Sequence, residues 1–278
     1  MKVCAALAVL LTALGGAAPI CAQPWSTALP TPQGGDYGNG AATSDVVGGV
    51  FTVGARARAT PAIAFGIPTG YGADWRDVFA AAGMQRGLRY DRDFTDGAVF
   101  GGAGLGNAQR NIGIEVTIAV IDLVGETLKD QTLSIKLHRR LGAWSVAAGI
   151  ENMFIMGATD GGTSAYGVLS GHLLPANRSR TWFQQVTVTA GIGDGRFNAV
   201  DRVRRGVNGV GVFGSMSVQV VSVLSVLATW TGQDLNVGLS IAPLSGVPLV
   251  VTPVLLDVTG RAGEGARLAM SGGIGLTL

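Results

Sequence analysis

The stretch NIGIEVTIAVIDL, residues 111–123, determines how the rest of the chain is interpreted. Branched apolar residues recur at every second position, and small or polar residues fill most of the positions between them. Successive side chains of a β-strand point to opposite faces of the sheet, whereas a helix repeats every 3.6 residues. The pattern therefore predicts a strand with one apolar face and one polar face.

The same alternation recurs on the C-terminal side of this stretch, most clearly in residues 182–193 and 235–242. Counting such segments between turn signals predicts about twelve strands: 77–89, 97–106, 111–123, 131–141, 144–156, 164–174, 182–193, 209–220, 223–231, 235–242, 248–258 and 266–278. Most are near the ~9–11 residues that a tilted strand needs to cross a bilayer. Strands 77–89, 164–174 and 248–258 alternate poorly, so ten to fourteen strands are compatible with the sequence.

The composition indicates a membrane protein that crosses with strands. The mean hydropathy is +0.39, yet no segment after residue 22 offers the ~18 uninterrupted apolar residues of a spanning helix. Apolar residues are instead distributed singly, as in a membrane barrel, where alternate residues face lipid. We therefore predict an all-β protein, a transmembrane antiparallel up-and-down β-barrel over residues 73–278. The net charge of +2 gives no basic face for nucleic acid.

Residues 1–22 have the features of a secretory signal peptide. Lys2 supplies the positive start, Val3–Ala13 is apolar, and Ile20-Cys21-Ala22 offers a cleavage site. Export to the envelope of a Gram-negative cell is therefore expected, and both cysteines would be removed with the signal. A lipoprotein anchor at Cys21 fits the preceding residues poorly. Residues 23–72, rich in Gly and Pro, are interpreted as a periplasmic lead-in or as a plug of the barrel.

The C-terminal strand carries a family resemblance. Met270, Ile274, Leu276 and Leu278 share one face of this strand. It resembles the last strand of bacterial outer-membrane proteins, although those strands usually carry aromatic residues where this chain has Leu276 and Leu278. The resemblance implies a location in the outer membrane, with lipid and the barrel-assembly machinery as partners.

Two further stretches, residues 73–79 and 231–239, are similar to uncharacterised outer-membrane barrels, including cyanobacterial ones. This resemblance implies a fold and a compartment for residues 73–278. It implies no activity, so no functional residues follow from it.

Charged residues on lumen-facing positions are the main candidate site: Glu115, Lys136, His138, Arg140, Glu151 and Arg267. The tight turn at residues 142–143 predicts Lys136 opposite Gly149 and diagonal to Glu151, and the expected register places Glu115 near His138 or Arg140. Neighbouring charges across strands interact. They would either select solutes by charge or form ion pairs that stabilise the wall.

A second group of charged residues, all of them basic, lies in the longest predicted outer loop: Arg196, Arg202, Arg204 and Arg205. It would contact an anionic envelope polymer such as lipopolysaccharide, or it is simply an exposed loop. No enzyme is expected. The only histidines, His138 and His172, begin no His-x-Ser pair of the kind used by barrel lipases, and no serine-elbow or zinc signature occurs. We predict no catalytic residue, metal or cofactor.

Three functions are compatible with these features. Lumen-facing positions are dominated by small residues, which cannot fill a twelve-stranded barrel, so the interior must hold water or another segment. The leading hypothesis is a porin-like passive channel for small hydrophilic solutes. The alternatives are a closed structural or envelope-tethering barrel, with residues 23–72 as its plug, and a soluble periplasmic β protein. The solute and the oligomeric state are not predicted.

Overall fold

The computed structural model describes most of the predicted barrel. The described residues are 60–87, 95–121, 130–156, 162–174, 182–199, 202, 205, 207, 209–244, 247–261 and 265–278. The predicted signal peptide, residues 1–22, and residues 23–59 lie outside this set. Among the described residues, no helix is long and apolar enough to cross a membrane.

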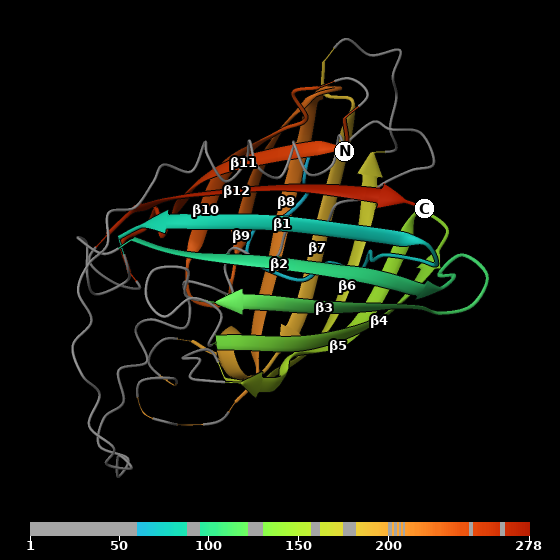
Figure 1. The fold of residues 1–278 in the computed structure, drawn as a ribbon. Coiled ribbons are helices and arrows are strands. Elements are labelled where there is room, and N and C mark those ends of the chain that lie inside the picture. The colour runs from blue at the N-terminus through green and yellow to red at the C-terminus, as the bar shows by residue number, and fades with distance from the viewer. Residues whose placement is uncertain are drawn as a thin grey trace.

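Twelve antiparallel strands form a closed barrel (Figure 1). The strands are β1 Asp77–Arg86, β2 Thr95–Gly106, β3 Gly113–Ile121, β4 Asp130–Leu141, β5 Trp144–Met156, β6 Ser164–Leu174, β7 Gln185–Gly193, β8 Gly211–Val221, β9 Leu224–Trp230, β10 Leu235–Ile241, β11 Leu249–Leu256 and β12 Arg267–Thr277. Each strand pairs with its neighbours in sequence, and β1 pairs with β12 to close the wall. The predicted up-and-down barrel and its most probable strand count are confirmed.

The two ends of the barrel are distinguished by the direction of the strands. We call the end where the odd-numbered strands begin the near end, and the opposite end the far end. The two-residue turn between β4 and β5 lies at the near end, and Gly142 adopts a φ of +65° there, a conformation that glycine tolerates best. This turn fixes the register of the hairpin, so Lys136 stands opposite Gly149 as predicted.

Apolar side chains cover the outside of the barrel. On β5, Val146 and Ile150 are each 39% exposed, whereas the alternate residues Ser145 and Ala147 are buried. Apolar residues are also the exposed ones on β8, where Val212 is 63% exposed. Buried polar residues line the interior of most strands, among them Thr132, Ser164, Ser170, Thr187, Thr189, Ser217, Ser225, Thr229, Ser240, Thr252 and Ser271. The faces predicted from the alternation are therefore observed, with apolar residues outside.

Tryptophans lie close to both rims. Trp75, Trp144 and Trp182 are at the near end, with exposed fractions of 64%, 37% and 62%, and Trp230 at the far end is 41% exposed. Such positions are typical of the aromatic girdles of membrane barrels, where the ring meets the polar interface.

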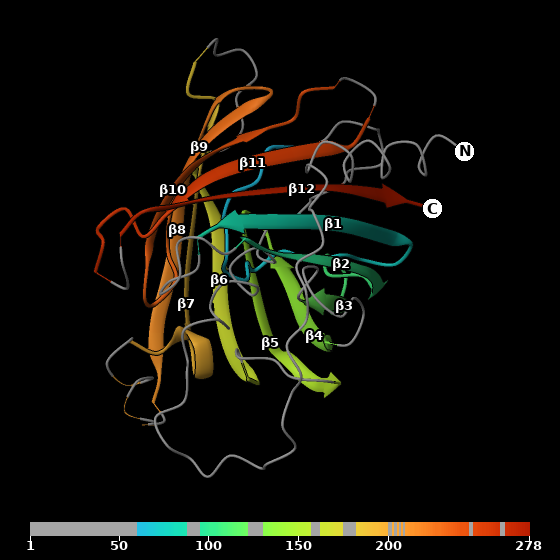
Figure 2. The same cartoon turned by 60° about the vertical axis from the view of Figure 1, so that its left-hand side comes forward.

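Residues 60–74, here called the interior segment, run inside the barrel (Figure 2). Phe65, Ile67 and Thr69 are all completely buried. The segment contacts Ser240 at the near end, rises to Thr229 in the far half, and returns to Ser170 in the near half. Gly66, with a φ of 75°, lies at the reversal. The interior is therefore occupied by the chain itself along much of its length.

Two apolar clusters surround this segment. The first contains Phe65 of the segment with wall residues Ala81, Phe100, Ala119, Leu227, Val254, Leu256 and Ala269, and Phe79 packs against it. The second contains Ala64 and Ile67 of the segment with Ala147, Tyr166, Val168, Phe197 and Phe213. Part of the interior is thus packed like the core of a soluble protein.

Candidate functional site

The rising part of the interior segment is held by hydroxyl groups of the wall. The backbone N–H of Ala62 donates to Ser240 Oγ at 2.7 Å. Ser215 Oγ donates to the carbonyl of Ile63 at 3.1 Å. Because inward-facing hydroxyls alternate along the strands, they satisfy backbone groups that burial would otherwise leave without partners.

Gly70, in the returning part of the segment, packs tightly against the wall. Its N–H donates to Ser170 Oγ at 2.9 Å, and its carbonyl accepts from Ser145 Oγ at 2.6 Å. A Cβ atom at Gly70 would overlap the backbone carbonyl of Ser145 and approach the backbone nitrogen of Ser170. The segment therefore fits between β5 and β6 only because residue 70 has no side chain.

An ion pair anchors the segment to β3 and β4. Glu115 Oε1 lies 2.7 Å from Lys136 Nζ, and the two side chains are 16% and 8% exposed. Glu115 Oε2 also accepts from the N–H of Ala73 at 2.8 Å. The register places Glu115 directly opposite Lys136 and diagonal to His138, which stands opposite Gly113, so the expected proximity of Glu115 to His138 is observed. The β3–β4 connection, residues 122–129, is too long to fix the register by turn geometry.

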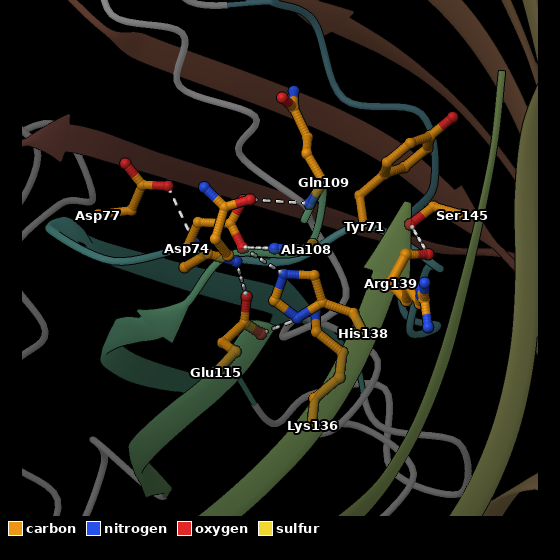
Figure 3. Close-up of polar contacts among 12 residues, drawn as sticks. Tyr71, Asp74, Asp77, Ala108, Gln109, Glu115, Lys136, His138, Arg139 and Ser145 are labelled. Atoms are coloured by element: carbon orange, nitrogen blue, oxygen red, sulfur yellow. Dashed lines mark hydrogen bonds and ion pairs between the residues drawn. The ribbon is translucent and has the colours of Figure 1, made fainter. Parts of the chain in front are cut away.

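His138 is packed beneath the end of the segment (Figure 3). Its Nε2 lies 3.3 Å from Asp74 Oδ1, and the side chain is 1% exposed. Asp74 Oδ1 also accepts from the N–H of Ala108 at 2.8 Å. A Cβ atom at Gly72 or Gly113 would overlap the imidazole. Two glycines therefore provide the space for this ring.

Tyr71 joins the segment to a polar group on β6. Its hydroxyl lies 3.3 Å from His172 Nε2, and the two rings stack with centroids 5.7 Å apart. His172 Nδ1 contacts Gln185 Nε2 at 2.8 Å and Thr187 Oγ1 at 3.0 Å. The Arg140 guanidinium carbon lies 5.7 Å from the centre of the Tyr71 ring, a cation–π distance.

Ser170 lies two residues before His172 on β6, a pair relevant to hydrolytic chemistry. The Ser170 hydroxyl contacts Thr189 Oγ1 at 2.8 Å and accepts from Gly70 N–H. A base must form a hydrogen bond to the hydroxyl group that it deprotonates. The hydrogen bonds described for Ser170 and for His172 go to other residues, so they do not link this serine to this histidine.

Comparison with known proteins adds no family to this description. No protein-family model matches the chain, and no curated protein matches it either. The resemblance to porin-like and cyanobacterial barrels stays a prediction. Among the described residues, no group of three or more His, Cys, Asp or Glu side chains is arranged to hold a metal ion.

Arg196 lies inside the far mouth, which corrects its expected place in an exposed outer loop. Its Nε lies 2.5 Å from Glu151 Oε2, and its Nη1 donates to the carbonyl of Gly66 at 2.8 Å. The short 3-10 helix η1, Gly195–Phe197, turns the β7–β8 loop into the barrel. Pairing with Glu151 compensates the buried charge. Arg202 and Arg205 are exposed, and Arg204 lies outside the described residues.

A second buried ion pair lies near the far end. Arg267 Nη2 is 3.0 Å from Asp234 Oδ2, and the side chains are 4% and 0% exposed. The sequence indicated Arg267 as a lumen residue, and its side chain is buried here. The sequence did not identify Asp234 as the partner of Arg267 or Asp74 as the partner of His138. Each aspartate lies outside the strands, where the alternation of apolar and polar residues does not predict the direction of a side chain.

The predicted assembly signal lies on β12 and on Leu278, the residue that follows it. Met270, Ile274, Leu276 and Leu278 lie on the face opposite Arg267 and Ala269, and Leu278 is 64% exposed whereas Ile274 is buried. Recognition by an assembly machinery stays a prediction.

Proposed function

We propose that the chain is an outer-membrane β-barrel whose lumen is closed by residues 60–74. The observation that supports this function is the buried interior segment, hydrogen-bonded to β3, β5, β6, β8, β9 and β10 through side chains of the wall. This corresponds to the closed barrel among the functions that the sequence left open. The proposal includes no catalytic step and no cofactor.

The apolar outer surface supports the membrane location. Val212, Leu268 and Ile118 are more than half exposed, and exposed apolar side chains recur around the wall. An apolar outer surface of this kind is unfavourable in water and favourable against lipid. In this proposal the signal peptide exports the chain, the barrel-assembly machinery inserts it, and membrane lipid covers the strands.

A porin-like channel is the second candidate. The specific observation in its favour is the set of hydroxyls on the inner wall, among them those of Thr187, Thr189 and Ser217. If the interior segment leaves its place, these groups line a polar passage for small hydrophilic solutes. The first candidate does not conduct, because the interior segment stays in place, whereas the second conducts once the segment has left. A conductance measurement therefore distinguishes the two.

Conductance across planar bilayers tests the closure. The full-length protein is expected to be silent, and Gly70→Ala is expected to produce discrete conductance steps, because the added methyl group overlaps the backbone of Ser145. Gly167→Ala is the matched control, since a Cβ there meets nothing within 4 Å.

Steady conductance by the wild type would overturn the closed state and favour the porin-like channel. A correctly folded variant lacking residues 60–72 that stays silent would show that this segment is not the barrier. Extraction of the protein without detergent would contradict the membrane location and favour the soluble periplasmic alternative.

A further inference from the structure

The seam between β10 and β11 differs from the rest of the barrel wall. Its register contains three residue pairs, Val237↔Leu255, Gly238↔Val254 and Ile241↔Val251. Within the described strands, the least extensive of the other seams, β8–β9 and β9–β10, contain seven pairs each. Two of the missing pairs lie in the middle of the β10–β11 seam, where Leu239 and Ser240 face Pro253 and Thr252.

Pro253 explains the interruption. Proline has no backbone N–H and is therefore normally confined to edge strands or bulges. In place of the ladder, side chains join the strands, since Thr252 Oγ1 donates to Ser240 Oγ at 3.0 Å. Ser240 Oγ also accepts from the N–H of Ala62. The seam is thus supported from inside by the interior segment.

Apolar surface lies on both sides of this interruption. Outside, Val237, Leu239 and Leu255 are 39%, 42% and 49% exposed. Inside, Val254 and Leu256 of β11 belong to the apolar cluster around Phe65. Gly238, opposite Val254, carries no side chain, and a Cβ there would overlap Val254 Cγ2. Where the strands separate beside Gly238 and Val254, next to the Ser240–Thr252 hydrogen bond, an apolar path from the outer surface to Phe65 would therefore form.

We propose that the β10–β11 seam opens laterally and admits the acyl chain of a membrane amphiphile into the apolar cluster around Phe65. This inference rests on the proposed membrane location of the barrel. A hydrophilic solute gains nothing from this cluster, whereas an alkyl chain exchanges lipid neighbours for the side chains of Val254, Leu256 and Leu227. Phe65 occupies this place in the closed barrel, so chain entry displaces it and the adjoining part of the interior segment.

Photolabelling in lipid vesicles tests the inference. The protein is reconstituted in phosphatidylcholine vesicles containing a fatty acid with a mid-chain diazirine, irradiated, and mapped by mass spectrometry. We expect label on the inward residues Leu227 and Val254 as well as on the outward residue Leu239.

A disulfide across the seam supplies the deciding variant. In a background with Cys4→Ser and Cys21→Ser, the pair Val237→Cys/Leu255→Cys joins outward positions that face each other across the seam and leaves Pro253 in place, within reach of a disulfide. Oxidation is expected to reduce inward labelling at least tenfold, and dithiothreitol is expected to restore it. The matched control, Ala82→Cys/Val99→Cys, locks the intact β1–β2 seam and is expected to leave labelling unchanged. Pro253→Val, which restores the backbone donor without a crosslink, is expected to reduce inward labelling severalfold.

The outcomes separate a failure of lateral entry from a failure of the proposed membrane location. Equal inward labelling of the oxidised seam variant and the oxidised control overturns lateral entry. Label confined to outward residues in the wild type also overturns it, but leaves the membrane location standing. Absence of label at every residue overturns both proposals. Each variant is also run on a detergent gel before and after heating. A change of mobility on heating, like that expected of the wild type, shows that the variant is folded.

Discussion

The two sides of the barrel interior hold the same segment by different means. On the β3–β6 side, Tyr71 and Ala73 meet His172 and Glu115 through directional polar contacts. On the other side, Phe65 packs against apolar side chains of β1, β2, β9, β11 and β12 and against Ala119 of β3, and its backbone N–H donates to Thr229 Oγ1. Hydrogen bonds fix position but contribute modestly to net stability, whereas burial is non-directional and contributes more. The polar side therefore sets where the segment lies, and the apolar side contributes more to keeping it there.

Breaking the polar side at its ion pair should have the largest effect, because a carboxylate left buried without its cation costs more than the intact pair contributes. Lys136→Met leaves the Glu115 carboxylate buried without its cation, which costs about 4 kcal/mol of unfolding free energy. Urea unfolding followed by tryptophan fluorescence measures this loss. Glu115→Gln/Lys136→Met should recover most of it, and Arg139→Met, at an exposed outward position, should lie within about 0.5 kcal/mol of the wild type. A full loss in the double variant would contradict the ion pair as the cause.

Emptying the apolar side should rank second. Phe65→Ala removes a completely buried ring from the first cluster and is expected to cost about 3 kcal/mol. The same unfolding assay measures the cost, and conductance steps should accompany it as the segment loosens. Phe65→Leu preserves much of the volume and should cost less than about 1.5 kcal/mol. Equal losses for Ala and Leu would show that packing is not what holds Phe65.

Removing a single hydroxyl should have the smallest effect. Ser170→Ala deletes the acceptor of the Gly70 N–H and should cost about 1 kcal/mol, measured in the same way. The control Ser222→Ala lies in an exposed turn and should be within about 0.5 kcal/mol of the wild type. A cost as large as that of Phe65→Ala would reverse the comparison between the two sides.

Most of the wall was predictable from the sequence, because alternation reports the facing of residues in the strands where it is clear. Lys136 opposite Gly149 was also predictable, since a two-residue turn sets that register. The opposition of Glu115 and Lys136 was not, because a long connection leaves the register to side-chain pairing. Arg196 was assigned to an exposed loop, since the sequence alone gives no sign that Glu151 would draw this guanidinium into the mouth.

The path of residues 60–74 was less accessible still. The segment has no periodicity, and its place depends on hydroxyls from strands far away in the chain. Pro253 was a visible signal, because proline in the middle of a strand marks a missing ladder bond. The sequence alone does not show that the β10–β11 seam contains three residue pairs.

The reversal of the interior segment at Gly66 means that both of its ends lie at the near end of the barrel. It can consequently be withdrawn as a loop, without threading a chain terminus through the wall or separating a strand pair. Tension applied at residue 60 would load its contacts one after another, beginning with Ala62 on Ser240 and continuing with Ile63 on Ser215. Contacts loaded in series break at a lower force than contacts loaded together, so a pull from the near end would empty the barrel at a lower force than a load that all of these contacts shared.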